Sequence, residues 1–76
     1  MDNKEPIKRK FAENLKLLRE RKGISIRELS LRANLEYAQV QRIEKGKVNL
    51  SLSTIIALAE GLDIHPKKLL DFEFEY

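Results

Sequence analysis

The feature that most constrains how this chain can fold is residues 24–46, which combine helical apolar patterns with capping and turn residues. Ser25 and Glu28 have the S-x-x-E spacing of a capping box, in which the hydroxyl accepts from a free helix N–H and the carboxylate reaches back to the capping residue. Asn34 tolerates the positive φ of a tight turn, and Gly46 suits the left-handed position after a helix end. The stretch therefore predicts two short helices separated by a turn.

Apolar residues at helical spacing indicate which sides of these two helices face the interior. They are Ile26, Leu29 and Ala33 in the first helix and Val40 and Ile43 in the second. Leu35 lies in the turn, where it would fill the gap between the helices. Two short helices joined in this way form a helix-turn-helix.

The flanking sequence predicts three further helices. Before the central stretch, Pro6 suits a first helical turn and Gly23 a helix end, with one apolar stripe between them: Ile7, Phe11, Leu15 and Leu18. After it, Ser51 is expected to cap a helix whose broad apolar surface we attribute to a central position, with Gly61 helping to end it. Pro66 is expected to start a last short helix, with His65 only flanking it.

The chain is thus predicted to be an all-α, compact five-helix domain. Residues 1–5 are expected to be a flexible N-terminus, residues 6–71 the domain, and residues 72–76 a short extended tail. The helices are expected at about residues 6–22, 25–33, 36–45, 51–61 and 66–71.

In the tail, Phe72, Phe74 and Tyr76 alternate with two glutamates, which is the period of a half-buried strand. One interpretation is that a single aromatic ring closes the core. The other is that the tail pairs with the same tail of a second subunit, since an unpaired strand edge recruits another chain. We favour the second, which makes these three aromatic residues the predicted dimer interface.

Composition excludes several classes of protein. The chain has 76 residues, no cysteine and one histidine, so it is one small domain with no disulfide and no predicted metal site. No apolar run approaches the length of a membrane helix, and a cytoplasmic location is expected. Residues 1–50 hold 13 Lys and Arg against 7 Asp and Glu, whereas residues 51–76 hold 2 against 5. The basic half contains the helix-turn-helix, as a partner of a polyanion would require, although a solvated surface gives the same pattern.

In order and spacing, these motifs resemble the Cro and phage-repressor family of DNA-binding domains, also called the XRE family. The resemblance covers nearly the whole chain, from I-S-I-R-E-L at residues 24–29, through R-I-E-K-G at residues 42–46, to the apolar helix that follows. It implies a phage-repressor type fold and a sequence-specific regulator of transcription. Such a protein would bind double-stranded DNA through the major groove, as a homodimer on a two-fold operator and most simply as a repressor, with no cofactor and no enzymatic activity.

The resemblance also implies roles for individual residues. The base-contacting positions correspond to Tyr37, Ala38, Gln41 and Arg42. Phosphate contacts are expected from Ser25, Ile26 through its backbone N–H, Arg27, Gln39, Lys45, Lys47 and Asn49. Arg19 and Glu44 correspond to a structural ion pair that ties the first helix to the third.

Two residues depart from the family pattern, and one other function stays open. Asn34 replaces the common turn glycine, which its tolerance of positive φ allows. Glu36 stands at the start of the recognition helix where Ser or Thr is usual; its charge suits the helix dipole but would repel phosphate, unless it accepts from a cytosine amino group. The alternative function is an antitoxin or other interaction protein that binds a protein partner, such as a toxin, through the tail. An enzyme is disfavoured because the chain has no paired-carboxylate, nucleophile–base or Gly-rich phosphate signature.

Overall fold

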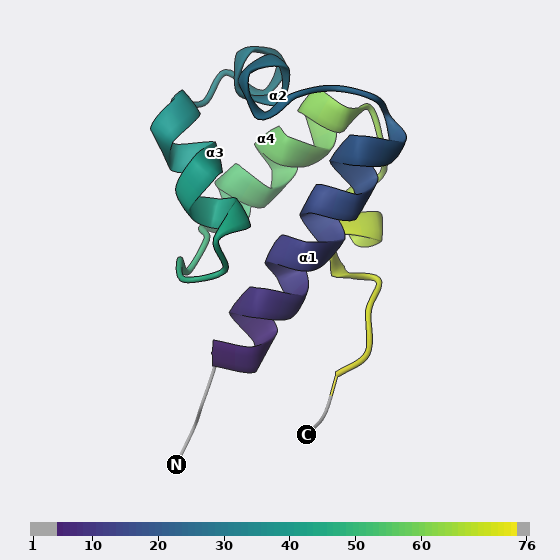
Figure 1. Ribbon diagram of the computed structural model, residues 1–76. Coiled ribbons are helices and arrows are strands. Elements are labelled where there is room, and N and C mark those ends of the chain that lie inside the picture. The colour runs from purple at the N-terminus through teal and green to yellow at the C-terminus, as the bar shows by residue number, and fades with distance from the viewer. Residues whose placement is uncertain (1–4, 75–76) are drawn as a thin grey trace.

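Four α-helices and one 3₁₀ helix make up the computed structural model, which describes residues 5–74 (Figure 1). They are α1 (Glu5–Arg21), α2 (Ile26–Ala33), α3 (Tyr37–Glu44), α4 (Leu52–Leu62) and the 3₁₀ helix η1 (Pro66–Leu70). The all-α architecture is confirmed, but the prediction of five α-helices was wrong in its last element. In η1 the N–H of Lys68 donates to the carbonyl of His65, and that of Asp71 to the carbonyl of Lys68, which is the i to i+3 pattern of a 3₁₀ helix.

One apolar core draws on every helix. Its largest fully buried side chains are Leu15 of α1, Leu29 of α2, Val40 of α3, Leu58 and Leu62 of α4, and Leu69 of η1. The periodic apolar stripes of the sequence supply these residues, because each helix must bury one side to be stable in so short a chain. Figure 1 shows α4 crossing the middle of the molecule, with α2 and α3 on one side of it.

Residues at the helix ends adopt the conformations that their side chains favour, with one exception. The hydroxyls of Ser25 and Ser51 accept from the N–H groups of Glu28 and Thr54, at 3.0 and 3.2 Å. Asn34 has a φ of 57°, as a left-handed turn residue. The exception is the end of α4, where the sequence predicts that Gly61 helps to end the helix.

Gly61 lies inside α4, and Asp63 takes the left-handed position instead, with a φ of 56°. The glycine has a different function. A Cβ atom at Gly61 would come within 3.0 Å of both the backbone nitrogen of Ala33 and a methyl group of Leu29. Gly61 therefore lets α4 approach α2 closely, which is a packing requirement rather than a helix stop.

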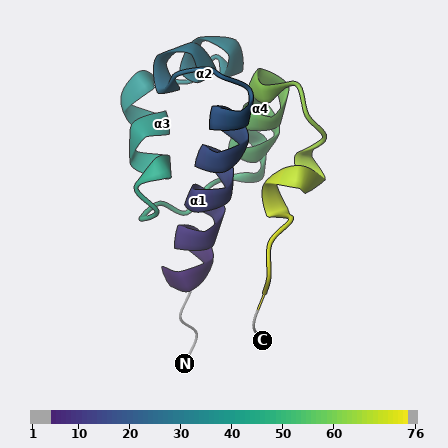
Figure 2. The same cartoon turned by 45° about the vertical axis from the view of Figure 1, so that its right-hand side comes forward.

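The end of the chain folds back onto α1 (Figure 2). The side-chain amide of Asn14 donates to the carbonyls of Lys68 and Leu69, at 2.8 and 3.0 Å, which holds η1 against α1. Beyond η1, Phe72 packs against the core, and the Lys10 ammonium donates to the carbonyl of Glu73 at 2.8 Å. The segment 72–74 is thus held by its own chain.

The aromatic tail is only partly available to a second subunit. Phe74 stacks on Phe72 with 4.7 Å between ring centroids, and 39% of its surface is exposed. Phe72 is partly buried, as expected if one ring closes the core. Tyr76 and residues 1–4 lie outside the described part of the chain.

The broad apolar surface of α4 is only partly explained by a central position. Leu58, Ala59 and Leu62 are buried, but Leu52 is 75% exposed and Ile56 is 37% exposed. They lie on the first turns of α4, directly after the loop that leaves α3. A central position therefore accounts for the buried residues of this surface but not for Leu52 and Ile56.

Candidate nucleic-acid interface

The turn between α2 and α3 sets the relation of the two helices. The left-handed backbone of Asn34 reverses the chain, and the N–H of Leu35 donates to the carbonyl of Ser30 at 2.9 Å. The side chain of Leu35 is partly buried and packs against the core. The turn is therefore fixed by a backbone conformation, a hydrogen bond and an apolar contact.

The outer side of α3 presents the four residues expected to contact bases. Val40 and Ile43 are 0% and 2% exposed, so this side of the helix faces inward. The opposite side carries exposed side chains at helical spacing: Tyr37, Ala38, Gln41 and Arg42. The DNA major groove is wide enough to admit an α-helix, and its base edges present hydrogen-bond donors and acceptors. The exposed side of α3 carries side chains that can pair with them.

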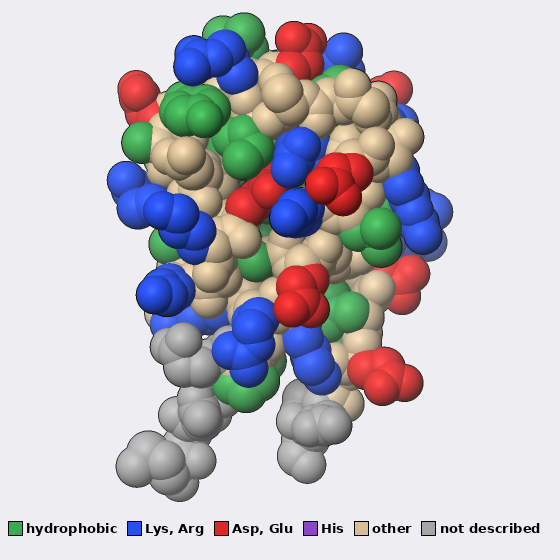
Figure 3. All heavy atoms as spheres, in the orientation of Figure 1, with side chains coloured by type: hydrophobic (Ala, Val, Ile, Leu, Met, Phe, Trp, Pro, Cys, Tyr) green, Lys and Arg blue, Asp and Glu red, His purple; other side chains and the backbone are tan. Residues whose placement is uncertain are grey.

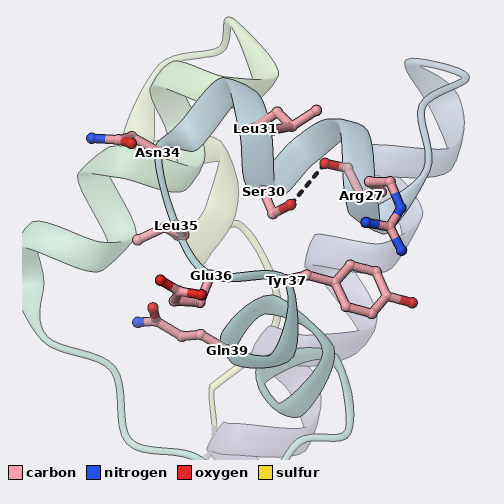
Figure 4. A pocket seen from close by; sticks show the side chains of 8 residues that line it. All are labelled: Arg27, Ser30, Leu31, Asn34, Leu35, Glu36, Tyr37 and Gln39. Carbon is pink, nitrogen blue, oxygen red and sulfur yellow. Dashed lines mark hydrogen bonds between the residues drawn. The ribbon is translucent and has the colours of Figure 1, made fainter.

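Arg27 and Tyr37 form a contact that the sequence did not indicate. The guanidinium carbon of Arg27 lies 4.7 Å from the centre of the Tyr37 ring, a cation–π arrangement. Figure 4 shows the ring reaching from the first turn of α3 toward the first turn of α2, with Arg27 beside it. The contact connects a residue expected to bind phosphate with one expected to bind a base. No local pattern reports it, because the two residues meet only once the turn is formed.

Most residues expected to contact phosphate are exposed. They are Ser25, Arg27, Lys45, Lys47 and Asn49, whereas Ile26 and Gln39 are partly buried. The partial burial of Ile26 leaves its expected role unchanged, because the first N–H groups of a helix have no partner within that helix. In Figure 3, Lys and Arg side chains lie along the edge of the molecule formed by α3.

The expected pair of Arg19 and Glu44 is present and connects α1 to the end of α3. Arg19 Nε donates to Glu44 Oε2 at 2.6 Å, and Arg19 Nη2 donates to Glu44 Oε1 at 3.0 Å. A third bond runs from Arg19 Nη1 to the carbonyl of Ile24 at 2.9 Å. Only 11% of the arginine side chain and 6% of the glutamate side chain are exposed. The hydrogen bond to Glu44 raises the pKa of Arg19, against the opposing effect of burial.

The two other glutamates of this region differ from their expected arrangements. The carboxylate of Glu28 accepts from Arg32 Nε at 2.9 Å, one turn further along α2, so only the Ser25 half of the capping box forms. An i, i+4 ion pair competes for that carboxylate. Glu36 precedes α3 but makes no capping hydrogen bond with its side chain.

Other kinds of site are not found in residues 5–74. These residues contain no group of three His, Cys, Asp or Glu side chains that could hold a metal ion. His65 only flanks η1, where its Nδ1 accepts from the N–H of Lys67 at 3.1 Å. No helix of the described chain has the length and apolar character that crossing a membrane requires.

Comparison with known proteins settles the family. A helix-turn-helix family model matches residues 15–69, most of the chain. The chain belongs to the helix-turn-helix family. The predicted membership of the Cro and phage-repressor group is confirmed.

One solved structure supports the same assignment for this helix-turn-helix protein. It is the restriction-modification controller protein C.AhdI from Aeromonas hydrophila, with a TM-score of 0.82 and 38% sequence identity. The match covers 84% of this chain and 97% of the controller protein. A search of curated protein sequences found no match. Together, the family and the solved structure identify the chain as a DNA-binding regulator of transcription.

Proposed function

We propose that this helix-turn-helix protein binds a two-fold DNA operator as a homodimer and represses transcription by occupying it. The observation that carries the proposal is the exposed side of α3, where Tyr37, Ala38, Gln41 and Arg42 project from a helix whose other side is buried. A recognition helix in the major groove places its N-terminal residues against base edges. The chemistry of these four side chains suits that position.

Each base-contacting residue has a preferred partner. Arg42 suits guanine, to which a guanidinium donates two hydrogen bonds, and Gln41 suits adenine for the same geometric reason. The methyl group of Ala38 suits contact with a thymine methyl. Tyr37, held beside Arg27, suits a sugar or phosphate at the edge of the groove.

Phosphate contacts on both sides of α3 would set the position of the helix in the groove. On one side the start of α2 offers the hydroxyl of Ser25, the free N–H of Ile26 and the guanidinium of Arg27. On the other side Lys45, Lys47 and Asn49 follow the end of α3, and Gln39 lies on its flank. Such contacts add affinity and orientation but do not read sequence.

A two-fold operator requires two copies whose recognition helices lie about one helical turn, or 10 base pairs, apart. The tail aromatics Phe72, Phe74 and Tyr76 are the proposed contact between copies. Within the described residues, Phe74 carries most of this role, because the ring of Phe72 is largely engaged by its own core. The ring of Phe74 remains 39% exposed.

Selection from a randomised duplex library at near-physiological salt tests the proposal. We expect an inverted repeat with half-sites about 10 base pairs apart. Retention of DNA without enrichment of any sequence would refute sequence-specific binding and leave only attraction to phosphate. Enrichment of a single half-site without its repeat would refute the dimer while retaining the recognition helix.

A further inference from the structure

Glu36 is a charged residue at the reading end of the recognition helix with nothing to neutralise it. It immediately precedes α3, and its backbone carbonyl accepts from the N–H of Val40 at 3.1 Å, as a capping residue should. Its side chain is exposed and forms no capping hydrogen bond. Figure 4 shows the carboxylate next to the side chain of Gln39, on the opposite side of the helix start from Tyr37.

The other acidic residues of the helix-turn-helix are neutralised within the protein. Residues 24–46 contain three glutamates, of which Glu28 pairs with Arg32 and Glu44 pairs with Arg19. Across residues 5–74, no hydrogen bond or ion pair engages the carboxylate of Glu36. Of the three charges, only this one is free to act on a ligand.

Stability of α3 does not explain the choice of residue. The carboxylate of Glu36 does interact favourably with the dipole of the helix whose N-terminus it precedes. A Ser, Thr or Asp at this position would nevertheless stabilise α3 more, because it would accept a hydrogen bond from a helix N–H that Glu36 does not accept. A residue that is not favoured as a helix cap, at the exposed start of a helix proposed to bind DNA, indicates a function in binding.

The charge has two consequences for a helix that enters the major groove. It is repelled by phosphates, so it weakens binding to DNA in general. At a base edge, however, a carboxylate accepts from the amino group of cytosine. Guanine and thymine present only acceptors there, and adenine places its N7 acceptor beside its amino group, so all three repel a carboxylate more than cytosine does. A negative charge in this position therefore favours some sequences and penalises others, which is how specificity arises from unfavourable contacts.

We infer that Glu36 is a specificity-determining residue that reads a cytosine in each half-site and lowers affinity for DNA that lacks it there. The inference rests on the proposed function and deepens it, since it adds one base position to those read by α3. It requires the cytosine to lie beside the base contacted by Ala38, because Ala38 follows Glu36 in the first turn of the helix.

The test compares the sequences selected by the wild-type chain, Glu36→Gln and the control Glu28→Gln. Both substitutions remove one negative charge from the helix-turn-helix, but only the first removes it from the start of α3. We expect the wild type and Glu28→Gln to select the same operator. Glu36→Gln, whose amide can also donate to guanine and thymine, should show a preference for cytosine at one position in each half-site that is weaker by about tenfold, and it should bind unrelated DNA more tightly than the wild type.

A second measurement isolates the amino group itself. The selected cytosine is replaced by 2-pyrimidinone, which lacks that group. Binding by the wild type should then fall about tenfold, whereas Glu36→Ala, whose side chain has no acceptor, should bind the two duplexes equally.

Two results would overturn the inference while leaving the proposed function intact. One is an inverted repeat selected equally by the wild type and Glu36→Gln, with a uniform rise in affinity, which would reduce Glu36 to a repulsive charge. The other is an operator with no cytosine preference that depends on residue 36. If the wild type selects no sequence, the proposed function itself fails, which is a different outcome. Thermal unfolding of Glu36→Gln should stay close to wild type, because the side chain makes no bond to lose.

Discussion

Replacing Arg19 by alanine should destabilise the fold more than any change on the exposed side of α3. The substitution removes two hydrogen bonds to Glu44, at 2.6 and 3.0 Å, and one to the carbonyl of Ile24, at 2.9 Å. It also leaves the carboxylate of Glu44, whose side chain is 6% exposed, without its cation. Most of the lost free energy of unfolding comes from leaving this buried charge uncompensated, and not from the loss of the ion pair itself.

The size of the effect follows from that burial. Removing one partner of a buried pair costs about 3–5 kcal/mol, and we take the lower end because both side chains keep some contact with solvent. A chain of this length has a total stability of about 4–11 kcal/mol. The loss is therefore a large share of the total, and it corresponds to a melting temperature lower by about 12–24 °C.

Circular dichroism melting of five variants tests the reasoning: Arg19→Ala, Arg21→Ala, Arg19→Met, Glu44→Leu and the double variant of the last two. Arg21→Ala, which removes an exposed arginine from the same helix, is the control and should change the stability by less than about 0.5 kcal/mol. Arg19→Met combined with Glu44→Leu removes both charges and should be less destabilised than the two single variants added together. A melting temperature of Arg19→Ala equal to that of the control, or simple additivity in the double variant, would refute the argument.

The same pair should add no pH dependence in the neutral range. The pKa of Arg19 is raised in the folded state, so its contribution to stability is fully present below the unfolded-state pKa and is lost only as the pH rises above it. The pKa of Arg19 lies far above neutrality in both the folded and the unfolded state. The melting difference between wild type and Arg19→Ala should thus not change between pH 6 and 8 through ionisation of Arg19, as melts at about these values would show.

Four further substitutions have outcomes set by named contacts. Arg42→Ala should weaken operator binding by about 1–3 kcal/mol and relax specificity at one base pair, whereas an equal loss on all sequences in a binding titration would place Arg42 on phosphate. Gly61→Ala should lower stability by about 1 kcal/mol, because the contact of its Cβ with the backbone of α2 outweighs the better helix propensity; a higher melting temperature would contradict this. Phe72→Ala should lower the melting temperature, with a cost of about 2 kcal/mol for a partly buried ring, whereas Phe74→Ala should weaken the dimer in sedimentation equilibrium. An unchanged dimer in Phe74→Ala would remove the tail from the proposed interface.

The features that could be predicted from sequence are those that local geometry determines. The 3.6-residue period indicated the buried sides of the helices, and Leu29, Val40 and Ile43 are buried as expected. Ser25 and Ser51 cap because a short hydroxyl reaches the N–H three residues ahead. These relations involve neighbours along the chain, so the sequence alone contains them.

The features that could not be predicted depend on how distant segments meet. Gly61 looked like a helix stop because the sequence does not show Ala33 packed against it. The contact of Arg27 with Tyr37 exists only because the turn brings two helix starts together. The conformation of η1 also involves a distant segment, because the side chain of Asn14, more than fifty residues earlier in the chain, donates to the carbonyls of Lys68 and Leu69. Each of these features depends on a contact that only the folded chain makes.

The contacts that hold α3 lie at its C-terminal end, away from the residues of its first turn that are proposed to read DNA. Its C-terminal end is fixed to α1, through the bonds between Glu44 and Arg19 and through Gly46, where an added Cβ would lie 3.1 Å from the backbone of Arg9. Its N-terminal end carries Glu36 and Tyr37, which are both exposed, and Tyr37 contacts Arg27 at the start of α2. Substitutions at this end should therefore change the operator with little effect on the fold, because the contacts that position the helix lie at the other end.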